Sequence, residues 1–140
     1  MVQRSTMEFD AQITFCIVAD LDETSDFYVD VLKLPLVLEQ SGCRIFRTCR
    51  DGYLGFCERD EGPSPDGVIL TLVTECVESF CEEVALRGAE LEKEPTYNEK
   101  YDITQAFLRD PSGYLIEIQR FEDPRWAEER DRVAAQHEES

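Results

Sequence analysis

The sequence predicts an α+β domain made of two modules of the same kind, each with a strand, a helix and then three strands. Segments with strand and helix patterns follow one another in the same order in both halves of the chain. A linker rich in turn-forming residues, over residues 61–67, separates the halves. A short pattern also recurs, because Arg50-Asp51-Gly52-Tyr53-Leu54 matches Arg109-Asp110 followed by Gly113-Tyr114-Leu115. Together these features favour two βαβββ modules.

Each element of the first module, residues 10–60, has a local signal. The apolar, β-branched run over residues 13–18 predicts a strand. Asp20 stands three residues before Glu23, which is the spacing of an N-cap and its capping-box partner, and it predicts the start of a helix over residues 21–33. Pro35 ends that helix. Further strands are then predicted over residues 36–39, 43–49 and 54–58.

The second module, residues 67–121, repeats this order. It opens with an apolar strand over residues 68–73, and apolar residues at helical spacing then predict a helix that ends at Gly88. Each module alone would bury too little apolar surface, so we expect both to share one core in a single domain over residues 10–121. The remaining strands of this module are predicted over residues 91–95, 103–109 and 114–121.

The two ends of the chain lie outside this repeat. Residues 1–9 are polar and are expected to form a tail. Residues 122–140 are expected to form a helix and a tail, because Asp123 can cap a helix whose first residue is Pro124. One face of that helix could dock on a partner subunit, cover a cleft or pack on its own domain, and it carries Trp126, Arg130, Val133 and His137.

Composition limits the classes of partner. The chain has 140 residues and a formal net charge of −17. Such a surface repels phosphate backbones, so we expect no nucleic-acid partner. No apolar run reaches the ~20 residues needed to cross a bilayer, and residues 1–8 have no signal-peptide core. We therefore expect no membrane partner and a cytoplasmic location. The acidity fits either a host with high internal salt or a protein that attracts cationic small molecules.

The cysteines give a further expectation. The chain has six of them, and no pair has Cys-x-x-Cys spacing. A cytoplasmic protein is kept reduced, so we expect buried, inert thiols and no zinc ribbon or redox dithiol.

Two motifs of the chain resemble those of a known superfamily. One runs from Asp20 to Leu32 with the sequence DLDETSDFYVDVL, and the other runs from Arg109 to Glu117 with the sequence RDPSGYLIE. In this order they resemble the vicinal oxygen chelate superfamily, which includes glyoxalase I, bleomycin-resistance proteins and extradiol dioxygenases. The resemblance implies two modules that form a curved, mostly antiparallel sheet, with helices on its convex side and a site on its concave face. It also implies a homodimer.

The resemblance further implies a metal ion held by one residue near the start and one near the end of each module. In this chain those positions fall on Ile13, Phe56, Ile69 and Glu117. Only Glu117 carries a donor atom, and a single carboxylate holds a divalent ion little better than water does. We therefore predict that the chain has no metal ion and no other cofactor.

A small-molecule site is predicted on the concave face instead. Alternation along the first strand places Ile13, Phe15 and Ile17 on one face, and an apolar cleft with a few polar groups suits a small organic ligand. Glu117 would serve as the ligand anchor or as a general base, and Tyr101 could stack on a cationic or aromatic ligand. The predicted ligand-binding residues are Ile13, Phe15, Phe56, Ile69, Tyr101, Leu115, Glu117 and Gln119.

The sequence leaves three functions open. The favoured one is a metal-free protein that binds and sequesters a cationic or aromatic small molecule, in the manner of bleomycin-resistance proteins. The second is a lyase, epimerase or dioxygenase with a rearranged metal site, or with Glu117 as a metal-free base. The third is a protein whose pocket is filled and which has only an interaction role. Whether the chain is an enzyme is therefore undecided by the sequence.

Overall fold

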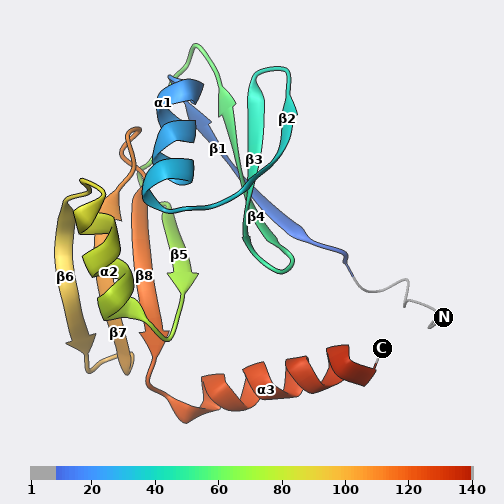
Figure 1. Ribbon diagram of the computed structural model, residues 1–140, viewed down its shortest axis with the longest axis vertical. Helices are drawn as coiled ribbons and strands as arrows, with labels where there is room; N and C mark the ends of the chain where they lie inside the picture. The colour runs from blue at the N-terminus through green and yellow to red at the C-terminus, as the bar shows by residue number, and fades with distance from the viewer. Residues whose placement is uncertain (1–8, 140) are drawn as a thin grey trace.

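The computed structural model describes residues 9–139, and it places strands and helices in the predicted order in both halves of the chain (Figure 1). The first module contains β1 (Gln12–Val18), α1 (Leu21–Asp26), η1 (Phe27–Val31), β2 (Leu36–Gln40), β3 (Cys43–Cys49) and β4 (Gly52–Glu58). The second contains β5 (Ile69–Val73), α2 (Val77–Leu86), β6 (Leu91–Asn98), β7 (Ile103–Arg109) and β8 (Leu115–Phe121). A C-terminal helix, α3 (Pro124–Glu139), follows. The predicted α+β class with two βαβββ modules is confirmed.

Each module forms its own four-stranded sheet, and the two sheets have the same topology. The strand orders are β1-β4-β3-β2 and β5-β8-β7-β6. In each sheet the first strand runs parallel to the last, and the other neighbours are antiparallel. The sheet type is therefore mixed and mostly antiparallel, as expected. Within residues 9–139 no hydrogen-bonded ladder joins β1 to β5, so the two modules form two separate sheets.

The first helix changes type along its length. It is α-helical over Leu21–Asp26 and π-helical over Phe27–Val31. The Asp20 side chain accepts a hydrogen bond from the Glu23 N–H at 3.0 Å, which is the predicted cap. Tyr28, in the π-helical turn, is fully buried.

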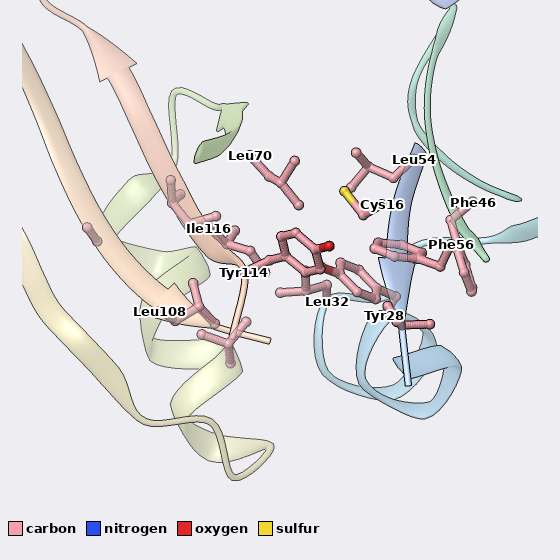
Figure 2. Close-up of a cluster of buried hydrophobic side chains, with 14 of the residues drawn as sticks. Cys16, Tyr28, Leu32, Phe46, Leu54, Phe56, Leu70, Leu108, Tyr114 and Ile116 are labelled. Carbon is pink, nitrogen blue, oxygen red and sulfur yellow. The ribbon is translucent and has the colours of Figure 1, made fainter. Parts of the chain in front are cut away.

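The hydrophobic core lies between the two modules (Figure 2). Helix α1 packs on β3 and β4, and α2 packs on β6, β7 and β8. The ring of Tyr28 stacks on that of Phe56, with centroids 4.4 Å apart. Neither module closes this core alone, because the buried residues include Leu32, Phe46 and Leu54 from the first and Leu70, Leu108 and Ile116 from the second.

The two motifs that carry the family resemblance touch each other in the folded chain. The Tyr28 hydroxyl, from the first motif, donates a hydrogen bond to Oδ2 of Asp110, from the second, at 2.7 Å. The Tyr114 hydroxyl donates to the backbone oxygen of Ile17 at 2.7 Å, which joins the modules again. Both motifs therefore hold the two modules together.

Asp110 also shapes the turn between β7 and β8. Its Oδ1 accepts the backbone N–H groups of Ser112 and Tyr114, each at 2.9 Å. The side chain is buried, and this burial raises the pKa of Asp110, while its hydrogen bonds oppose the rise. One carboxylate thus satisfies three donors in a place that water reaches poorly.

One pair of cysteines departs from the expectation. Cys43 and Cys57 form a disulfide between directly opposed positions of β3 and β4, with their Cα atoms 4.2 Å apart. The expectation of buried, free thiols is wrong for this pair, and it holds in full only for Cys16 and Cys81, because Cys49 and Cys76 are free but exposed. The two residues are 14 apart in sequence, and only the pairing of β3 with β4 makes them neighbours.

No helix within residues 9–139 has the length and apolar character needed to cross a membrane.

Candidate functional site

Each sheet has one face that packs into the core, and we call the other its open face. Along β1, Cys16 and Val18 are buried in the core, whereas Ile13 and Phe15 are 41% and 56% exposed on the open face. On β5, the side chain that pairs with Leu115 on the open face is Ile69, which is 57% exposed. The open faces therefore carry the large apolar side chains that strand alternation predicts for β1.

A polar cluster interrupts the apolar open face of the second sheet. We define it as Thr71 on β5, Asn98 on β6, Gln105 on β7, and Glu117 and Gln119 on β8. The strand register aligns Thr71 with Glu117, and Gln105 with Gln119. Gln105, Glu117 and Gln119 are each less than a tenth exposed. This is an unusual concentration of buried polar groups on one sheet face.

Hydrogen bonds hold the cluster in one arrangement. The Thr71 hydroxyl donates to Oε1 of Glu117 at 2.7 Å, and Nε2 of Gln105 donates to Oε2 of Glu117 at 2.5 Å. Nδ2 of Asn98 donates to Oε1 of Gln105 at 2.9 Å. Each oxygen of the Glu117 carboxylate therefore has one donor, and the donors come from the two strands that flank β8.

Glu117 forms no ion pair within residues 9–139, and both of its hydrogen-bond donors are neutral. A carboxylate that is only 8% exposed has lost most of its hydration. The site thus holds an anion that is hydrogen-bonded but not neutralised.

The prediction that Phe56 lines the site is wrong. Phe56 pairs with Cys16 and shares its face, so it is fully buried in the core against Tyr28. The sequence alignment matched Tyr53 to Tyr114, but Tyr53 pairs with Ile13 on the open face while Tyr114 is buried in the core. The repeat therefore slips by one residue, and a slip of one residue exchanges the two faces of a strand.

Gly55 takes the open-face position that the alignment gave to Phe56. It pairs with Phe15, as Glu117 pairs with Thr71 in the second sheet. A Cβ atom built on Gly55 would lie 2.4 Å from ring atoms of Phe15, so this ring lies directly over the glycine. The first sheet thus has an aromatic ring where the second has a carboxylate.

A cleft lies between the edge strands β1 and β5. Its volume is about 280 Å³, slightly below the ~300–1,000 Å³ typical of small-molecule pockets. Thr71 contributes to its wall and so connects the cleft to Glu117. The other residues that line it are Gln12, Thr14, Thr48, Gly52, Tyr53, Leu54, Val68, Ile69, Leu70 and Leu72.

The remaining predicted site residues lie at different distances from this cluster. Leu115 is on the open face two residues before Glu117, and Gln119 is two residues after it. Tyr101 lies in the turn between β6 and β7 and is 61% exposed. Its backbone N–H donates to Oδ1 of Asn98 at 3.4 Å, so Tyr101 adjoins the cluster through its backbone.

The residues at the superfamily's metal positions do not suit a metal ion. Ile13 and Ile69 have no donor atom, and neither does Gly55, which replaces Phe56 in the register. Within residues 9–139 no three His, Cys, Asp or Glu side chains gather where they could hold a metal. Glu117 is the one carboxylate at these positions, and both of its oxygens already accept hydrogen bonds.

Sequence reasoning missed Thr71, Asn98 and Gln105. A signal for one of them was present, because Thr71 is a polar residue in the middle of a strand that is otherwise apolar. Their connection to Glu117 depends on strand pairing, which the sequence does not display.

Two βαβββ modules with a shared core and one carboxylate on an open sheet face define a class of small paired-module α+β domains. The model of the Glyoxalase/Bleomycin resistance protein/Dioxygenase superfamily matches residues 11–118, and the chain belongs to this superfamily.

Solved structures share this fold. The chain is similar to a glyoxalase/bleomycin resistance protein/dioxygenase from Nocardioides, with 17% identity, a TM-score of 0.69, and coverage of 88% of this chain and 87% of that one. It is also similar to TnmS3, an antibiotic binding protein from Streptomyces sp. CB03234, with 22% identity, a TM-score of 0.68, and coverage of 84% and 98%. TioX from Micromonospora sp. ML1 is similar as well, with 18% identity, a TM-score of 0.66, and coverage of 79% of this chain and 97% of that one. No curated protein matches the chain.

Proposed function

We propose that the chain binds and sequesters a small cationic organic molecule on its open face, without a metal ion. The observation that carries this proposal is the state of Glu117, a nearly buried carboxylate whose partners within residues 9–139 are all neutral. A cation placed against a desolvated carboxylate gains a charge-assisted hydrogen bond, which is stronger than a neutral one. A ligand cation would therefore complete the site.

The surroundings of Glu117 support such a ligand. Ile69, two residues before Thr71 on β5, is more than half exposed and offers apolar surface to its organic part. The net charge of −17 attracts cations to the protein as a whole. TnmS3, an antibiotic binding protein, has the same fold, which is consistent with a role in holding a small molecule.

The Glu117→Gln variant tests this function. Glutamine keeps the size of the side chain and removes its charge, so we expect the Kd for a cationic ligand such as bleomycin to rise about tenfold or more. Isothermal titration calorimetry measures the change. The matched control is Glu82→Gln, which makes the same charge change at an exposed position of α2, and we expect it to leave the Kd unchanged. Absence of heat and of thermal shift across a broad panel of cationic compounds would contradict the proposal.

Metal analysis tests the metal-free part. Protein purified without chelator is expected to contain far less than one equivalent of zinc, nickel, iron or manganese, because Ile13, Gly55 and Ile69 offer no ligand atoms. A near-stoichiometric content of any of these metals would favour an enzyme with a rearranged metal site.

We also propose that two copies of the chain pair through their open faces. The cleft of about 280 Å³ is small for a complete site, and Phe15 and Ile69 are left exposed on the open faces of the two sheets. We expect analytical ultracentrifugation at high salt to give twice the chain mass, and a weaker dimer at low salt because the two copies are both strongly acidic. Phe15→Glu should prevent pairing, whereas Leu86→Glu, on the exposed side of α2, should not. A monomer at every salt concentration would exclude this assembly.

A further inference from the structure

We infer that Glu117 recognises a planar cation with two parallel N–H donors, an amidinium or guanidinium group, in preference to an ammonium group. This inference rests on the proposed function and specifies the chemical class of its ligand. It follows from how the two oxygens of the carboxylate are held.

The Glu117 carboxylate accepts hydrogen bonds from residues on both of its neighbouring strands. The donor to Oε1 is Thr71 on β5, and the donor to Oε2 is Gln105 on β7, the two strands that flank β8. Each carboxylate oxygen can accept two hydrogen bonds, so each retains one acceptor position. Because the existing donors approach from opposite sides, the remaining positions lie between them on the outer edge of the carboxylate. A forked pair of N–H groups matches such an edge, as in arginine–carboxylate pairs.

The Gln105 side chain, one of the two donors to Glu117, is itself held in one orientation. Gln105 donates through Nε2 to Glu117, and its Oε1 accepts the Nδ2–H of Asn98 at 2.9 Å. Reversal of the Gln105 amide would break both hydrogen bonds at once, so this amide has one orientation. The Glu117 carboxylate is therefore oriented before a ligand arrives, and binding loses little side-chain freedom. Preorganisation of this kind favours a ligand whose donors already have the matching spacing.

Gln119 provides a further hydrogen-bond acceptor next to the outer edge of the Glu117 carboxylate. It lies two residues after Glu117 on the same face of β8, and it is 7% exposed. Within residues 9–139 its side-chain amide makes no hydrogen bond, and its amide atoms stay in contact with solvent. Amidinium and guanidinium groups have N–H groups beyond the two that form a fork, and the Gln119 carbonyl can accept one of them. An ammonium group has three diverging donors and is more strongly hydrated, so it loses more on entering this site.

Three small probes with the same ring test the inference. Benzamidine carries the planar cation, benzylamine carries an ammonium group, and benzamide is a neutral analogue of benzamidine. Their Kd values can be measured by chemical-shift titration of the isotopically labelled full chain. We expect benzamidine to bind at least about tenfold more tightly than benzylamine. We expect no measurable binding of benzamide.

Three variants test which residues cause the preference for benzamidine. Glu117→Gln should remove the preference for benzamidine, and Glu82→Gln should preserve it. Gln119→Leu should weaken benzamidine several-fold and leave benzylamine unchanged. Circular dichroism and thermal melting of each variant check that it is folded.

The outcomes separate this inference from the proposed function. If benzamidine and benzylamine bind equally and both lose affinity in Glu117→Gln, the inferred preference for two parallel N–H donors is wrong, but the proposed cation site at Glu117 is retained. If a larger cationic ligand binds through Glu117 but benzamidine shows no advantage over benzylamine, the inference also fails. If no cation binds the folded chain, both fail together.

Discussion

Replacing Phe56 with alanine is expected to lower the free energy of unfolding by about 3–5 kcal/mol, because it removes a large, fully buried ring and leaves a cavity. The ring of Phe56 lies against Tyr28 and near Phe46, so the cavity would open at the centre of the first module's part of the core (Figure 2). Chemical denaturation of the variant measures the loss.

Phe15→Ala is the matched control for this experiment. It removes the same side chain from the neighbouring strand, but from the open face, where the ring is 56% exposed. We expect a loss of less than about 1 kcal/mol in stability. Equal losses in the two variants, or a larger loss for Phe15→Ala, would mean that the face assignment of β1 and β4 is reversed.

The second large effect is expected at Asp110. Replacing it with alanine leaves three donors without this acceptor. The Tyr28 hydroxyl and the Tyr114 N–H are buried, and the Ser112 N–H is partly buried. Each unsatisfied buried group costs about 1–3 kcal/mol, and relief of the buried charge offsets part of this sum, so we expect a net loss of about 3 kcal/mol. Denaturant unfolding followed by circular dichroism measures it.

The sequence repeat provides the control. The sequence repeat matches Asp51 to Asp110, but the Asp51 side chain is 56% exposed and pairs only loosely with Arg50, at 3.9 Å. We expect Asp51→Ala to cost less than about 0.5 kcal/mol. Similar losses at both aspartates would argue against the contact between the modules as the cause.

The dependence on pH distinguishes the charge of Asp110 from its hydrogen bonds. Burial raises the pKa of Asp110, so the folded chain binds this proton more tightly than the unfolded chain does. The contribution of this group to stability therefore grows as the pH falls through its folded-state pKa. Asp110→Asn cannot titrate, so the stability of the natural chain relative to this variant should rise on acidification. A difference that stays flat with pH would show that the Asp110 charge carries no cost.

Much of the fold could be predicted from the sequence because its signals are local. The N-cap at Asp20, the apolar strand over residues 13–18 and the turn residues between strands act over a few neighbouring residues. Element boundaries were less accurate. The helix predicted over residues 21–33 changes to a π-helix and ends at Val31, and the strand around Pro95 continues to Asn98.

The candidate site was predicted only in part. Glu117 and the exposed apolar residues of β1 were placed on open faces, because alternation along one strand needs no knowledge of its partner. Phe56 was placed on the wrong face, because matching Tyr53 to Tyr114 by letter ignored the pairing of Tyr53 with Ile13. Alternation holds within a strand, but the relation between strands depends on register.

The sequence by itself determined that this protein has two βαβββ modules, a shared core and a strongly acidic surface, since patterning, turn chemistry and charge are properties of neighbouring residues or of composition. Only the tertiary structure decided which distant side chains meet. Tyr28 reaches Asp110 across 82 residues and Thr71 reaches Glu117 across 46. Such contacts depend on strand order and register, which arise when the whole chain packs and which no local pattern records.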